Sequence, residues 1–86
     1  MSLREQFGKR LRQLRFERRM TQDEFYGELL APLTPQHGGA IERGVKTPSF
    51  DLLERIAERL SIPVMELFRF DDTVPKKEIR LPRKRR

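Results

Sequence analysis

Few side chains in this sequence of 86 residues have the chemistry and spacing that catalysis requires. His37 is the only histidine and cysteine is absent, which excludes a multi-histidine metal site, a thiolate zinc site and a thiol nucleophile. Neither a phosphate-binding glycine loop nor a nucleophile-elbow motif occurs. We therefore expect a protein that is not an enzyme and that uses no cofactor, metal ion or small-molecule substrate.

The net positive charge of the sequence is concentrated at its carboxyl end. The formal net charge is +6, and residues 76–86 account for all of it. The basic residues of this tail are Lys76, Lys77, Arg80, Arg83, Lys84, Arg85 and Arg86. Clustered lysines and arginines displace condensed counterions from nucleic acid, so such a tail is typical of an arm that contacts a polyanion. An unfolded solubilising end and contact with an anionic membrane surface are the alternatives.

Length and composition limit the architecture to one small domain. The chain is 36% apolar and 37% charged, which suffices for a single core. Its longest apolar run, residues 29–33, is far shorter than the ~20 residues that span a bilayer, and its charged start lacks the apolar region of a signal peptide. We expect a cytoplasmic protein with no membrane association, folded over residues 1–72, with a flexible, disordered basic tail over residues 73–86.

Two capping boxes predict the first two helices. Ser2 and Glu5 have the spacing at which a hydroxyl and a carboxylate each bond the backbone amide of the other residue. Thr21 and Glu24 repeat this arrangement. The first helix is predicted to run to about residue 19, and the second from about residue 22 to near residue 30.

Three further helices follow in the prediction, and no strand is expected. Thr34 before Pro35 favours the start of a third helix, because a hydroxyl cap precedes proline at the first helical position, and Gly44 ends it. Ser49 caps a fourth helix, and Pro63 opens a fifth. The fifth helix is expected to direct three apolar side chains inward: Val64, Leu67 and Phe68.

Several short motifs occur in the order and near the spacing typical of one protein family. They are LRQLR at 11–15, TQDEF at 21–25, AIERG at 40–44, PS at 48–49 and ELF at 66–68. Over about residues 5–70 the sequence resembles the Cro and lambda-repressor type, or XRE type, of helix-turn-helix DNA-binding domain. The resemblance implies an all-α, five-helix domain whose third helix enters the major groove of double-stranded DNA.

The amino end of the third helix carries the residues that the resemblance places against base edges. Gln36 is the expected reader, because its amide can pair in two places with adenine. The neighbouring His37 can donate or accept a hydrogen bond there. Thr34 would cap the helix and contact a phosphate.

Other residues are assigned by the resemblance to the DNA backbone or to the framework. Gln22 would contact a phosphate at the start of the second helix, where free backbone amides also favour an anion. Arg43 and Lys46 would contact the sugar-phosphate backbone, and solvated surface positions are the alternative for all three residues. Arg15 and Glu42 occupy positions that form an ion pair in this family, with a structural role.

The sequence departs from the family pattern around the turn and in the third helix. The stretch 30–35 is two residues longer than the usual turn, and Tyr26 replaces a small residue. Gly38 and Gly39 each weaken a helix by roughly 1 kcal/mol relative to alanine, and Gly38 occupies a position that is often apolar. Three explanations remain open: close approach of the backbone to DNA, a helix that orders on binding, or space filled by Tyr26 and the longer turn.

Two functions are compatible with these features. The first is a sequence-specific transcriptional regulator, a repressor that binds as a homodimer to half-sites about one helical turn apart. The second is a protein-interaction module of the same fold, such as an antitoxin or a regulatory subunit. An apolar patch near the end of the domain could bind such a partner or a second copy: Val64, Met65, Phe68 and Phe70.

Overall fold

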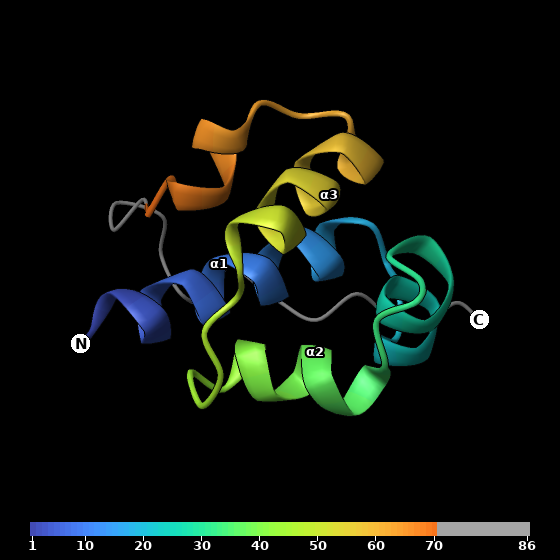
Figure 1. The fold of residues 1–86 in the computed structure, drawn as a ribbon, viewed down its shortest axis with the longest axis horizontal. Coiled ribbons are helices and arrows are strands. Elements are labelled where there is room, and N and C mark those ends of the chain that lie inside the picture. The colour runs from blue at the N-terminus through green and yellow to red at the C-terminus, as the bar shows by residue number, and fades with distance from the viewer. Residues whose placement is uncertain (71–86) are drawn as a thin grey trace.

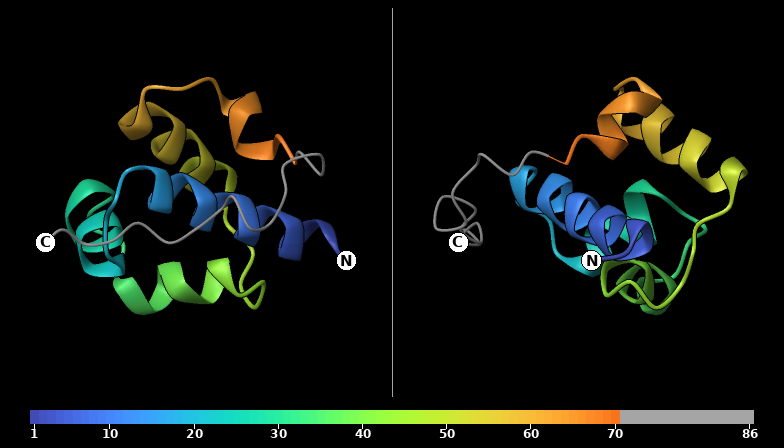
Figure 2. Two further views of the ribbon diagram at one scale, coloured as in Figure 1. Left: turned by 180° about the vertical axis from the view of Figure 1, so that it is seen from behind. Right: turned by 90° about the vertical axis from the view of Figure 1, so that its left-hand side faces the viewer.

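The first helix lies at the centre of the molecule. The computed structural model describes residues 1–70, in which α1 spans Leu3–Glu17. It lies between α2 (Pro35–Glu42) on one side and α3 (Phe50–Leu60) with the short segment η2 (Val64–Phe68) on the other (Figure 1). The views from behind and from the side agree (Figure 2). The predicted capping box is present: the Glu5 amide donates to the Ser2 hydroxyl at 3.2 Å, and the Ser2 amide donates to the Glu5 carboxylate at 2.8 Å.

The second predicted helix is a π-helix, η1, which spans Asp23–Leu29. The Leu30 amide donates to the Phe25 carbonyl at 2.9 Å, a bond that reaches back five residues instead of four. Thr21 and Glu24 form the second capping box, with bonds of 2.8 and 3.1 Å. Phe25 and Tyr26 are both fully buried, and their rings meet edge to face at 5.0 Å.

The third predicted helix is α2, which spans Pro35–Glu42. The Thr34 hydroxyl accepts from the His37 amide at 3.1 Å, as expected for a cap. Gly44 follows the helix with a φ of +78°, a conformation in which a side chain would be strained. The turn between η1 and α2 is fixed at its start. There the guanidinium of Arg59, from α3, donates to the carbonyl of Leu29, the last residue of η1, at 2.7 Å.

The remaining elements are α3, Phe50–Leu60, and a short 3-10 helix η2, Val64–Phe68. Ser49 caps α3 as predicted, with its hydroxyl accepting from the Leu52 amide at 3.1 Å. The expectation that Val64 faces inward was wrong, because it is 44% exposed. Leu67 is fully buried, and the Phe68 ring, although 36% exposed, lies 5.3 Å from the ring of the buried Phe7. This short segment therefore covers the core with Leu67 and with one side of the Phe68 ring, and leaves Val64 outside it.

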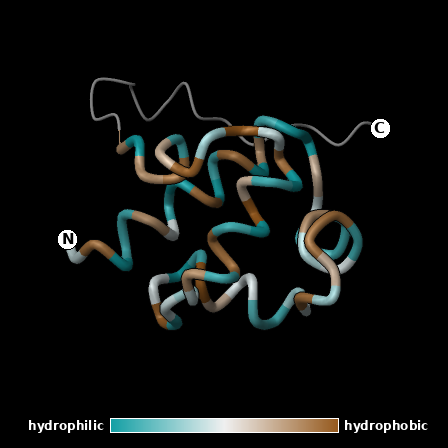
Figure 3. Tube along the Cα trace, turned by 45° about the horizontal axis from the view of Figure 1, so that its top comes forward, coloured by the Kyte–Doolittle hydropathy of each residue, from teal (hydrophilic) through white to brown (hydrophobic). Residues whose placement is uncertain are grey.

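The core is formed by apolar side chains from every helical element. Along the trace, hydrophobic and hydrophilic residues alternate at helical spacing (Figure 3). The buried apolar residues are Phe7, Leu11, Leu14, Phe25, Tyr26, Leu30, Ile41, Leu52, Leu53, Ile56, Ala57, Leu60 and Leu67. Within residues 1–70 the fold is all-helical, without strands, although two of the five predicted helices are a π-helical and a 3-10 segment.

Two sequence predictions fall beyond these residues. The expected domain end at residue 72 and the basic tail over residues 73–86 lie outside the part of the chain that the structure describes. No helix in the described part has the length and apolar character needed to cross a bilayer.

Candidate nucleic-acid interface

A buried ion pair joins α1 to the end of α2. The Arg15 guanidinium donates two hydrogen bonds to the Glu42 carboxylate, from Nε at 2.7 Å and from Nη2 at 3.0 Å. The two side chains are 10% and 4% exposed. Removing one partner of such a pair leaves a buried charge uncompensated and typically costs about 3–5 kcal/mol. The pair therefore fixes where α2 lies against α1.

The same carboxylate also accepts hydrogen bonds from the η1 region. The Tyr26 hydroxyl donates to the Glu42 carboxylate at 2.5 Å, and the side-chain amide of Gln22 donates to the same carboxylate at 3.3 Å. Burial raises the pKa of Tyr26, and the bond to the carboxylate raises it further. Burial lowers the pKa of Arg15, but the bonds to Glu42 outweigh this and the net shift is upward. Glu42 therefore connects α1, η1 and α2 through one side chain.

Gly38 leaves a space in α2 that the Tyr26 ring occupies. A Cβ atom at Gly38 would overlap three carbon atoms of that ring. Of the three explanations that the sequence left open for this glycine, the structure therefore supports filling of the space by Tyr26. The large residue in η1 and the missing side chain in α2 are complementary.

Gly39 lies beneath two side chains that the sequence assigned to the DNA backbone. A Cβ atom at this position would be 3.3 Å from Arg43 Nη1 and 3.4 Å from both polar atoms of the Gln22 amide. The structure thus brings Gln22 and Arg43 together over one point of α2. A guanidinium next to an amide at the start of a helix is an arrangement suited to a phosphate group.

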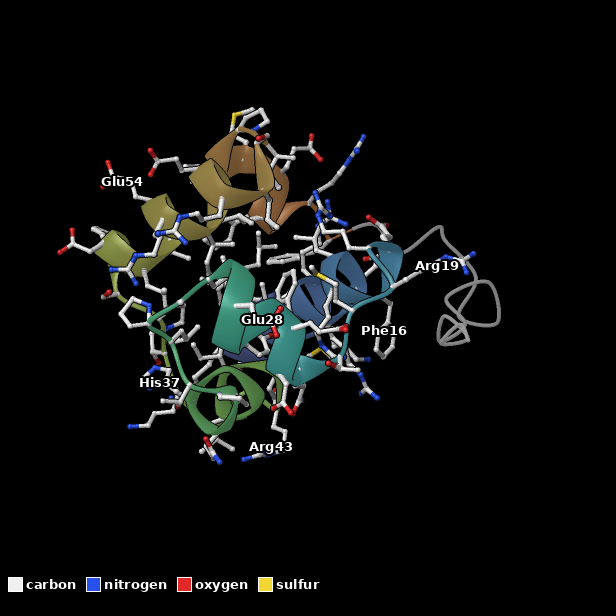
Figure 4. All side chains as sticks on the ribbon, turned by 90° about the vertical axis from the view of Figure 1, so that its right-hand side faces the viewer. Phe16, Arg19, Glu28, His37, Arg43 and Glu54 are labelled. Atoms are coloured by element: carbon white, nitrogen blue, oxygen red, sulfur yellow. The ribbon has the colours of Figure 1, made fainter. Side chains whose placement is uncertain are left out.

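The remaining predicted contact residues are exposed. Thr34, Gln36 and His37 lie at the amino end of α2, and Lys46 lies in the loop that follows the helix. Within residues 1–70, neither the side-chain amide of Gln36 nor the imidazole ring of His37 forms a hydrogen bond. His37 and Arg43 project outward from α2, whereas Glu54 projects from α3 elsewhere on the surface (Figure 4). The outer side of α2 is accordingly available to a ligand.

The sequence did not reveal one residue that positions α2. A Cβ atom at Gly8 of α1 would overlap the carbonyl oxygens of Ile41 and Glu42, so the backbones of α1 and α2 are in contact there. The only sequence signal was a glycine within an otherwise regular helical pattern, which indicates close packing when the helix is not broken.

The described part of the chain contains no group of three or more histidine, aspartate or glutamate side chains that could hold a metal ion. The predicted basic tail residues lie outside the described residues, so their position relative to α2 stays a prediction. The arrangement at α2 consists of amides, a guanidinium and an imidazole on a helix held from its inner side. Such groups recognise a ligand by hydrogen bonds and charge.

Comparison with known proteins gives matches among solved structures. No protein-family profile matches the chain, and no curated protein matches it. The restriction-modification controller protein C.AhdI from Aeromonas hydrophila is 33% identical with a TM-score of 0.67, and the match covers 74% of this chain and 90% of that protein. ComR from Streptococcus suis is 31% identical with a TM-score of 0.67, and the match covers 90% of this chain and 25% of ComR.

A third structure shares the fold at lower identity. The DNA-binding domain of BldD is 24% identical with a TM-score of 0.70, and the match covers 79% of this chain and 99% of that domain. The identity to C.AhdI, over nearly all of that protein, agrees with the motifs, the helical order and the buried Arg15–Glu42 pair. This chain belongs to the Cro and lambda-repressor type of helix-turn-helix proteins.

Proposed function

We propose that this chain is a sequence-specific DNA-binding transcriptional regulator, a repressor, that inserts α2 into the major groove. One observation carries the proposal. The inner face of α2 is held by buried contacts at Gly38 and Glu42, while Gln36 and His37 at its amino end are exposed. A helix held in this way can present side chains to base edges without disturbing the fold. The similarity to a restriction-modification controller and to a DNA-binding domain supports the same function.

The proposed contacts divide into positioning and reading. Gln22 and Arg43, together over Gly39, and Lys46 in the next loop bind phosphates and set the docking. Gln36 and His37 hydrogen-bond to base edges. Residues 76–86 add attraction that does not depend on sequence, because seven of these eleven residues are basic.

The proposed regulator acts in the cytoplasm as a homodimer. Val64 and Met65 on η2 are 44% and 77% exposed, and together with Phe68 they offer apolar surface to a second copy. Two copies related by a two-fold axis would bind half-sites about one helical turn apart.

Selection of binding sites from random duplex DNA at fixed salt tests the proposal. We expect a palindromic consensus and an affinity that falls steeply as salt is raised. Binding to a scrambled duplex of the same length is the matched control. Recovery of no preferred sequence by the intact chain would contradict the proposal.

A protein-interaction module of the same fold is the second candidate, and the apolar surface of η2 favours it. Under that function the same chain would bind a protein tightly and would show no salt-dependent affinity for duplex DNA. The salt titration therefore separates the two candidates.

A further inference from the structure

Tyr26 contacts α2 at two points that are one helical turn apart. Its ring lies against Gly38, where a Cβ atom would overlap it, and its hydroxyl donates to Glu42 at 2.5 Å. Residues four apart lie on the same face of a helix, so both contacts are on the inner face of α2. The Tyr26 side chain is fully buried, which leaves it one position.

These two contacts constrain different movements of α2. The ring sets how closely α2 approaches η1, because Gly38 has no side chain to hold the helices apart. The hydroxyl bond sets the rotation of the helix about its axis, since it acts together with Arg15 of α1, whose Nε donates to the same oxygen of Glu42 at 2.7 Å. Together they fix the direction in which the outer face of α2 points.

We propose that Tyr26 is a positioning residue for base recognition: with Gly38 as its counterpart, it sets the depth and rotation at which Gln36 and His37 meet DNA. The inference about DNA rests on the proposed function, whereas the pairing of Tyr26 with Gly38 does not. Recognition groups must be held to about half an ångström, so a change in the support alters selectivity before it abolishes binding.

A size exchange between the two positions tests the pairing without DNA. Tyr26→Ala empties the space, and Gly38→Leu forces a side chain into the ring, so each change alone should lower the midpoint of thermal unfolding. The double variant places the leucine in the vacated space, and its midpoint should lie above those of both single variants. A double variant no more stable than Gly38→Leu would overturn the pairing, whatever the protein binds.

Tyr26→Phe tests the role of the hydroxyl in recognition, because this variant keeps the ring that fills the core. On the duplex selected by the natural chain, we expect the ratio of affinities for selected and scrambled DNA to fall about tenfold. Affinity for scrambled DNA should stay unchanged, because it depends on phosphate contacts.

Ile56→Val is the matched control, since it truncates a fully buried core side chain on a different helix, α3. A purely structural loss lowers the active fraction and leaves the ratio unchanged. An unchanged ratio in folded Tyr26→Phe would therefore overturn the role in recognition. If the natural chain itself preferred no duplex, the proposed function would fail. The positioning role would then be decided by the NMR chemical shifts of the Gln36 and His37 backbone amides in DNA-free Tyr26→Phe. Shifts identical to those of the natural chain would overturn it.

Discussion

Gln36 and Arg43 differ in what surrounds them, although both lie on the outer side of α2. The Gln36 amide has no hydrogen-bond partner within residues 1–70, whereas the Arg43 guanidinium lies over Gly39 beside the Gln22 amide. A free amide is suited to reading a base edge, and a guanidinium held over the helix is suited to a phosphate. Truncation of Gln36 should therefore change the sequence preference of DNA binding, whereas truncation of Arg43 should change its overall affinity.

Gln36→Ala should relax the preference at one base step by about 1–3 kcal/mol, because the paired hydrogen bonds to a base are removed. Arg43→Ala should weaken binding to all sequences by a similar factor and lower the dependence on salt. Affinities for the selected duplex and for its single-base variants measure both effects. A Gln36→Ala protein with an unchanged preference at every step would show that another residue reads the bases.

Tyr26 should make the stability of the fold depend on pH in the alkaline range. Because the pKa of Tyr26 is raised in the folded protein, the unfolded chain loses this proton first, from about pH 10 upward. The contribution of Tyr26 to stability is thus complete below pH 10 and is lost as the pH rises above it. Urea unfolding of the natural chain and of Tyr26→Phe across this range should show a shallower decline for the variant.

Tyr26 is the only tyrosine, so tyrosinate absorbance follows its ionisation directly. At neutral pH, Tyr26→Phe should be less stable by about 1.5–3 kcal/mol, the usual contribution of a hydrogen bond to a charged group. Ionisation of the folded protein near pH 10 would mean that the hydroxyl is not buried against Glu42.

At the scale of elements, glycines within helices have opposite effects depending on their surroundings. Gly8→Ala would direct a methyl group into the carbonyl oxygens at the end of α2 and should cost about 1–3 kcal/mol of stability. Gly27→Ala is the matched control, because the nearest atom to its Cβ would be Pro35 Cγ at 3.9 Å. That variant should be neutral or stabilise the fold by about 0.4–1 kcal/mol. Chemical denaturation measures both, and equal effects would argue against close packing of α1 on α2.

The starts of helices could be predicted from the sequence because their causes are local. Ser2, Thr21, Thr34 and Ser49 all accept the hydrogen bonds expected of caps. The π-helical form of η1 could not be predicted, because the Leu30-to-Phe25 bond depends on packing that a capping pattern does not encode. The inward direction predicted for Val64 failed because burial depends on where the segment lies in the molecule.

The candidate site could be predicted only in part, because some of its contacts depend on how the helices pack. The positions of Gln36 and His37 on an exposed helix end followed from local signals around Thr34. The meeting of Gln22 and Arg43 over Gly39, and of Tyr26 with Gly38, joins residues from different helices. Such complementarity appears only once the helices are packed.

At the scale of the whole molecule, the net charge is distributed unevenly along the sequence. Residues 1–75 carry equal numbers of basic and acidic groups, so the net charge of +6 belongs to residues 76–86. A neutral body with a basic tail should acquire much of its long-range attraction to DNA from that tail.

Deletion of residues 76–86 should reduce the slope of log affinity against log salt by about 0.9 for each phosphate group that the tail had neutralised. The preference for the selected site should persist, because the residues that read bases remain. Replacing the seven basic residues by glutamine is the matched control, since it keeps the length of the chain. An unchanged slope in both variants would show that the tail does not touch DNA.

The separation between the inner and outer faces of α2 has a consequence for protein engineering. Framework contacts converge on Gly38, Ile41 and Glu42, whereas Gln36 and His37 are exposed and do not belong to the core. A library randomised at those two outer positions should therefore fold almost uniformly, and its members should differ in target and not in yield. This small domain would then be a scaffold for engineering new DNA-binding specificities, provided that Tyr26 is kept to hold α2 in position.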